Sequence, residues 1–137
     1  MKKMAQVMAV AVTAAILLAG CFGGDVSKTQ RAIGKSQLYN KGEISAAMNK
    51  VVRFFGKEFD GCILLELKYD EEYSVAPSDH WAEYYDADEV IVLQATFYVG
   101  ETGSNGSLEP NRTYKNYEWV LIRKGISGWN LQSWGYC

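Results

Sequence analysis

The strongest structural constraint in this chain is an apolar stripe between residues 44 and 59. Its members recur at intervals of three and four residues: Ile44, Ala47, Met48, Val51, Val52, Phe55 and Phe59. This spacing is typical of one face of an amphipathic helix. Asp60-Gly61 follows the stripe, and glycine suits the left-handed position at which helices end. Such a helix must cover its apolar face with another layer of structure.

Four later segments have the patterns of β-strands. They cover residues 62–69, 89–99, 114–124 and 129–136. In the first, alternation predicts one apolar face formed by Ile63, Leu65, Leu67 and Tyr69. The second is a β-branched and aromatic run. Local connections between the last three strands predict an antiparallel meander.

The order of these elements predicts an α+β domain. A long N-terminal helix is expected to pack on a curved four-stranded antiparallel sheet. One short extra helix is expected after the first strand, over residues 78–85, with Trp81, Ala82 and Tyr85 facing inward.

The first twenty residues have the features of an export signal. Lys2 and Lys3 precede an apolar run that ends in Leu-Leu-Ala-Gly-Cys21. The run has about fifteen residues, whereas a bilayer span needs about 20. Its end resembles the lipobox of bacterial lipoproteins, which implies that Cys21 is diacylated and becomes the first residue of the mature chain. The alternative is an uncleaved anchor with an incidental cysteine.

These features divide the chain into three parts. We expect a lipoprotein signal peptide at 1–20, a lipidated cysteine with a flexible tether at 21–41, and a single domain at 42–137. Two or more acyl chains hold a protein on a membrane more firmly than one. The protein is therefore expected at the cell membrane, lipid-anchored and facing outside the cytoplasm.

Several landmarks of the domain resemble a family of small exported Firmicutes domains of unknown function. They are the runs Phe59–Glu72 and Glu118–Arg123, Gly128-Trp129, and Trp134-Gly135-Tyr136. The resemblance covers about residues 45–137. It implies a cystatin-like fold, shared with the nuclear transport factor 2-like superfamily, and it supplies no catalytic residues. Relatives in that family commonly end at or near a glycine after the Trp-Gly-Tyr sequence. This chain departs from that pattern, because Cys137 stands at that position.

Two thiols, Cys62 and Cys137, remain once Cys21 carries lipid. They lie at the start of the first expected strand and at the end of the last. If those strands are adjacent, a disulfide can form in an oxidising compartment. The alternative is a buried Cys62 that acts as a small hydrophobe, with a free Cys137.

The charges are unevenly distributed. The net charge of −2 offers no basic footprint for nucleic acid. Between Lys57 and Glu89, eleven acidic residues stand against two basic ones. Because their spacing does not match a calcium loop, we expect a solvated acidic face that anionic lipid repels. A basic peptide is the partner that such a face would suit.

Five residues are candidates for a pocket or binding surface: His80, Trp81, Tyr85, Trp119 and Trp134. His80 could act as a base or as a pH switch, or it could be a surface histidine on a short helix. A lone histidine makes no typical zinc site, so no metal or cofactor is expected. The many aromatic residues also fit a small core that is built from large side chains.

Catalytic groups are scarce, so we predict a non-enzymatic binding or accessory lipoprotein. Its expected partner is a peptide, an envelope protein or a small apolar ligand. One alternative is a small lyase or isomerase that uses His80, Glu66 or Glu118 in a pocket between helix and sheet. It requires two ionisable groups in one closed pocket and a carboxylate with a raised pKa. A protease-inhibitor-like module is a further alternative, on fold analogy alone.

Overall fold

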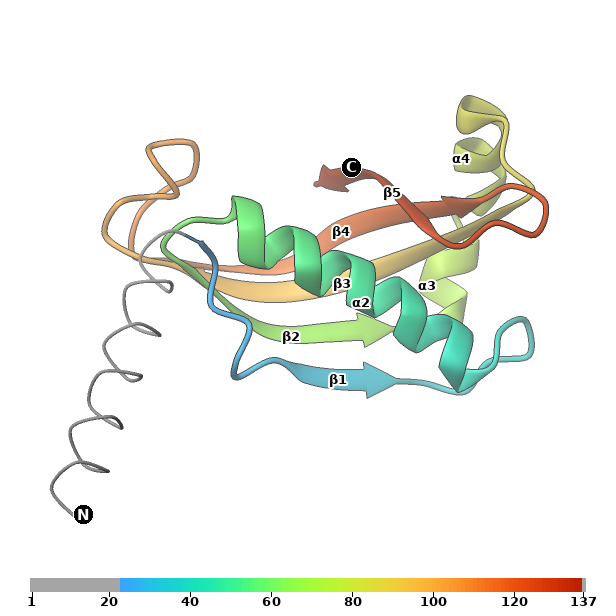
Figure 1. Ribbon diagram of the computed structural model, residues 1–137, viewed down its shortest axis with the longest axis horizontal. Coiled ribbons are helices and arrows are strands. Elements are labelled where there is room, and N and C mark those ends of the chain that lie inside the picture. Colours follow the sequence, from blue (N-terminus) through green and yellow to red (C-terminus); the bar gives the residue numbers. More distant parts are fainter. Residues whose placement is uncertain (1–22, 137) are drawn as a thin grey trace, which may run out of the picture.

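The computed structural model describes residues 23–136, which form a five-stranded sheet with a long helix on one face (Figure 1). The elements are β1 Gln30–Ile33, α2 Lys41–Glu58, β2 Cys62–Tyr69, α3 Glu71–Val75, α4 Ser78–Tyr85, β3 Glu89–Val99, β4 Arg112–Arg123 and β5 Asn130–Gly135. The strands lie across the sheet in sequence order. β1 is parallel to β2, and the other pairs are antiparallel.

The α+β class and the meander of the last strands are confirmed, but the four-stranded antiparallel sheet is wrong. β1 adds a parallel fifth strand before the long helix, and two short helices follow β2 instead of one. The sequence of β1 is Gln-Arg-Ala-Ile, and its side chains are exposed or half-buried. A four-residue edge strand of this kind has no hydrophobic period that could be recognised.

The segment expected to be a flexible tether is also folded from residue 23 onward. The Gly24 amide donates to the Gly56 carbonyl oxygen at 3.0 Å, and the Asp25 amide donates to the Cys62 carbonyl oxygen at 2.8 Å. Asp25 also pairs in parallel with Ile63. The tether expected at 21–41 is therefore wrong for residues 23–41, and the folded domain begins earlier than residue 42.

The long helix α2 follows from its sequence. Asn40 and Glu43 form a capping box, in which each side chain accepts a hydrogen bond from the other residue's backbone amide. The stripe is confirmed, since Ile44, Ala47, Met48, Val51 and Phe55 are all buried. Beyond the helix, Gly61 has a φ of 75°, the left-handed conformation expected there.

A bulge in β2 changes which of its residues face the helix. The register with β3 shifts between Leu64 and Glu66. The extra residue therefore moves the side chains that follow it to the opposite face of the sheet. Cys62 and Leu64 are consequently buried ahead of the bulge, and Leu67 and Tyr69 after it. The apolar face expected from simple alternation is wrong for Ile63 and Leu65.

Two clusters of buried side chains lie on opposite faces of the sheet. The larger lies under α2 and contains most of the buried aromatic residues. The smaller consists of Val90, Val92, Val120 and Ile122. The inward face expected for α4 is confirmed, because Trp81, Ala82 and Tyr85 pack on this smaller cluster.

Candidate functional site

The five candidate pocket residues do not form one site. His80, Trp81 and Tyr85 lie on α4, over the smaller cluster, and His80 is exposed. Trp119 belongs to the core under α2, and the Trp134 ring stacks on it. The sequence locates α4 along the chain but does not specify which face of the sheet it covers, and the sheet separates the two groups.

Within the second group, Trp134 lines a cavity of about 330 Å³, which we call the aromatic cleft, and Trp119 is packed against the Trp134 ring. The cleft lies between the C-terminal half of α2, the loop between β3 and β4, and the strands β4 and β5. Its lining residues are Phe54, Glu58, Phe59, Ser104, Ser107, Leu108, Tyr117 and Trp134. This volume falls at the small end of the range typical of ligand pockets.

Trp134 is the aromatic residue that the cleft offers to solvent. Its side chain is 41% exposed, although its ring lies 4.4 Å from the Phe54 ring and stacks at 6.0 Å on Trp119. Trp119 is fully buried beneath it. Within residues 23–136, the Trp119 indole nitrogen is the buried side-chain donor without a hydrogen-bond partner. Such a donor costs about 1–3 kcal/mol, so the packing around it must offset that cost.

The loop between β3 and β4 gives the cleft a fixed wall. The Leu108 amide donates to the Gly103 carbonyl oxygen at 2.8 Å, and Asn105 donates to the Asp60 carboxylate at 2.8 Å. Gly103 has a φ of 60°, and a Cβ there would lie 2.4 Å from the Leu108 carbonyl oxygen. Glycine is therefore required at this turn, and the two hydrogen bonds hold the loop in the position that forms the wall.

The sequence pointed to part of this cleft. Trp119 and Trp134 were expected as candidates, while Phe54 and Leu108 were not. Phe54 lies beside the helical stripe rather than on it, and a large aromatic residue off the stripe was the signal that could have identified it.

Cys62 lies under the same loop and is buried. Burial raises the pKa of its thiol, which suits a small core residue rather than a nucleophile. Cys137 lies outside the described residues. The condition set for a disulfide, adjacent first and last strands, is not met, because β3 and β4 separate β2 from β5.

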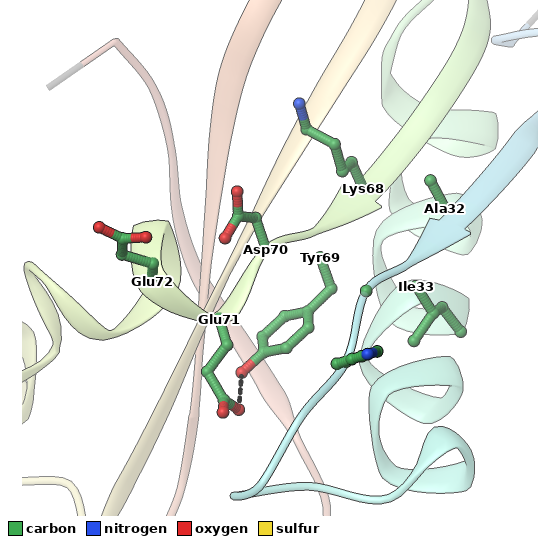
Figure 2. A pocket seen from close by; sticks show the side chains of 9 residues that line it. Ala32, Ile33, Lys68, Tyr69, Asp70, Glu71 and Glu72 are labelled. Carbon is green, nitrogen blue, oxygen red and sulfur yellow. Dashed lines mark hydrogen bonds between the residues drawn. The ribbon is translucent and has the colours of Figure 1, made fainter.

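A second cavity, of about 510 Å³, lies where β1 and β2 end (Figure 2). The Glu71 carboxylate occupies its edge and accepts hydrogen bonds from the Ser36 hydroxyl, the Gln37 and Leu38 amides, and the Tyr69 hydroxyl at 2.9 Å. The Gln37 amide and the other donors lower the pKa of Glu71 to about 2. With four donors from the chain itself, this carboxylate ties the β1–α2 connection to α3.

Because of these hydrogen bonds to Glu71, we expect the folded domain to lose stability in acid. The pKa of Glu71 is about 2 when folded and near its usual 4.5 when unfolded. Its contribution is therefore complete above pH 4.5 and is lost as the pH falls toward 2. Glu71→Gln should be less stable than the wild type at pH 7, and the two should converge in acid. Urea unfolding at several pH values between 7 and 2 checks this, and parallel curves would contradict it.

The residues named for the lyase or isomerase alternative do not meet its requirements. His80 is exposed on α4, and Glu118 accepts a hydrogen bond from Tyr73. None of His80, Glu66 or Glu118 lines the aromatic cleft. The carboxyl groups whose pKa is displaced, Asp25, Glu43 and Glu71, are all displaced downward by hydrogen bonds.

Among residues 23–136, no group of three or more potential metal-binding side chains lies close together. In the same part of the chain, no helix combines the length and apolar character needed to cross a bilayer.

Comparison of the chain with protein-family models, with curated proteins and with solved structures finds no match in any of the three. The resemblance to small exported Firmicutes domains, and to the cystatin-like fold, stays a prediction.

Proposed function

We propose that this protein is a lipid-anchored extracytoplasmic lipoprotein that binds a small ligand in its aromatic cleft, without catalysis. The observation that carries the proposal is the Trp134 ring. Trp134 is 41% exposed as a residue and lines a cavity of about 330 Å³, and its ring packs on Phe54 and on the buried Trp119. The proposal of a lipid anchor is based on the resemblance of the sequence ending at Cys21 to a lipobox.

The lining of the cleft indicates the class of ligand. Ligand pockets are mostly apolar, with a few polar groups that fix orientation. Here Phe54, Phe59 and Trp134 supply aromatic surface, while Glu58 and the hydroxyl of Ser107 lie among them. A carboxylate accepts hydrogen bonds, so the ligand that fits has a flat apolar face and carries hydroxyl or amino donors. Such a cleft binds by stacking, and its ionisable lining residues are Glu58 and Tyr117.

The binding test uses the full lipoprotein in detergent, with two panels of probes. One panel contains tryptamine and tyramine, and the other contains glucosamine and N-acetylglucosamine. Saturation-transfer NMR and tryptophan fluorescence should show saturable binding of at least one probe. Trp134→Ala should weaken that binding at least about tenfold, as expected for a central aromatic anchor.

Tyr84→Ala is the matched control, because Tyr84 is 70% exposed on α4. It should leave binding unchanged. The proposed site would be wrong if no probe saturates, or if Trp134→Ala binds as well as the wild type. The proposed site would also be wrong if Tyr84→Ala and Trp134→Ala weakened binding to the same extent, because Tyr84 lies on α4, away from the cleft.

The anchor has its own test. Mass spectrometry of the mature chain should show a diacylglyceryl group on Cys21 and the loss of residues 1–20. Cys21→Ala should abolish both changes. A wild-type chain of full precursor length without lipid would contradict the anchor while leaving the cleft unaffected.

A further inference from the structure

The chain becomes part of the fold two residues after Cys21. The Gly61 amide donates to the Gly23 carbonyl oxygen at 3.4 Å, and the Gly24 amide donates to the Gly56 carbonyl oxygen at 3.0 Å. Gly23 is buried. The start of the described chain is therefore held against the C-terminal end of α2.

The two glycines make this close contact possible. A Cβ at Gly23 would lie 2.1 Å from the Gly56 carbonyl oxygen, and a Cβ at Gly24 would lie 2.5 Å from the Phe55 carbonyl oxygen. Both distances are shorter than real contacts, and the two carbonyl oxygens belong to backbone that cannot move aside freely. Gly23-Gly24 thus serves packing against α2, although its composition is typical of a flexible linker.

This contact leaves a very short connection to the lipid. If Cys21 carries the acyl chains, as the proposed function holds, only Phe22 separates it from Gly23. Two residue steps span at most about 7 Å. The surface around Gly23 must then lie next to the lipid headgroups.

We define the anchor pole as Gly23, Gly24, the last turn of α2 with residues 59–61 after it, and residues 100–111. Hydrogen bonds join these segments, since the Gly100 amide donates to the Gly61 carbonyl oxygen at 3.0 Å and Asn105 donates to Asp60. Figure 1 shows them together at one end of the molecule, with α3 and α4 at the other.

The strands set the distance between the two ends. β3 runs from the α4 end to Val99, which pairs with Cys62 beside the anchor pole. Its 11 residues, at about 3.3 Å each, span roughly 35 Å. The far end carries these exposed carboxylates: Asp70, Glu72, Asp79, Glu83, Asp86 and Asp88.

We propose that the domain stands upright on the bilayer, with the anchor pole against the headgroups and the acidic α3–α4 end directed away from the membrane. The short connection, and not attraction to lipid, holds it there. The charged side chains of the anchor pole are Lys57, Glu58, Asp60, Glu101 and Glu109, so the pole is not basic. The aromatic cleft, lined by Ser104, Ser107 and Leu108 of this pole, then lies near the headgroups.

The test measures the depth of two positions in the full lipoprotein, in a Cys137→Ser background. Glu101→Cys labels the anchor pole and Glu83→Cys labels α4, and both native side chains are exposed. Each variant carries a fluorescent dye and is reconstituted in vesicles of phosphatidylcholine with some phosphatidylglycerol and a headgroup nitroxide lipid. The dye at position 101 should be quenched several-fold more strongly than the dye at position 83.

A flexible Gly-Ser linker of about 20 residues, inserted between Phe22 and Gly23, provides the control. It should reduce quenching at position 101 to the level at position 83. Equal quenching at the two positions in the native sequence would overturn the orientation. Unchanged quenching after insertion of the linker would overturn the short connection as its cause.

The same samples distinguish a wrong orientation from a missing lipid anchor. Lipid mass on Cys21 and flotation with the vesicles are measured first. A chain without lipid overturns the anchor and the orientation together. A lipidated, floating chain with equal quenching overturns the orientation alone.

Discussion

Replacing Phe55 with alanine is expected to lower the free energy of unfolding by about 3–5 kcal/mol. Phe55 lies on the buried face of α2 and is fully buried, and its ring lies 4.7 Å from Phe59 and 5.6 Å from Phe97. Gly24 also packs on this ring, since a Cβ there would come within 2.8 Å of it. The substitution therefore opens a cavity and removes support from the start of the chain. Denaturant unfolding followed by tryptophan fluorescence measures the loss.

Phe54→Ala is the matched control, one residue away on the same helix. Phe54 is half-buried and lines the aromatic cleft, where its ring contacts Trp134. Its loss should cost less stability than the loss of Phe55, while weakening ligand binding more. Equal losses of stability for the two variants would show that the core is not centred on Phe55.

Arg123→Ala should cost about 1–3 kcal/mol, because it removes the centre of a charged cluster. Its Nε and Nη2 donate to Glu89 at 3.0 Å each, and Nη2 also donates to Glu43 at 2.8 Å. The guanidinium lies 4.2 Å from the Trp129 ring centroid. These contacts join α2, β3, β4 and the start of β5. The estimate stays below the value for a fully buried pair because both carboxylates are partly exposed.

Arg123→Lys tests whether the positive charge alone, without the geometry of the guanidinium, stabilises this cluster. Lysine keeps the positive charge but lacks the planar fork that serves two carboxylates and stacks on an indole. We expect it to recover less than half of the loss, measured by thermal and urea unfolding. Full recovery would show that charge alone is sufficient at this position.

The sequence predicted the elements with strong periodicity. The buried stripe of α2 matches the structure, because a long apolar pattern reflects which face is buried. The bounds of β2 and β3 also match, although the bulge in β2 changes which of its residues are buried. It did not predict β1, a short, half-exposed edge strand. It also assigned Gly23-Gly24 to a tether, since composition does not distinguish a flexible glycine from one required by a close contact.

The sequence predicted only part of the candidate site, namely the residues that lie on strands with a regular pattern. Trp119 and Trp134 stood out because they alternate on strands, yet α4 was grouped with them although it covers the other face of the sheet. The loop that supplies Ser104, Ser107 and Leu108 carries no periodic signal. Its place in the cleft depends on tertiary hydrogen bonds such as Asn105 to Asp60.

The way in which the chain joins the sheet determines how the protein would respond to mechanical load. Asp25 and β1 run parallel to β2, starting from the end that carries Gly23. Tension between a lipid anchor and a partner held at α4 would act along these strands. Their hydrogen bonds would then be strained together in shear rather than opened one after another. Under such a load, the parallel pairing with β2 would resist peeling of the N-terminal segment from the sheet.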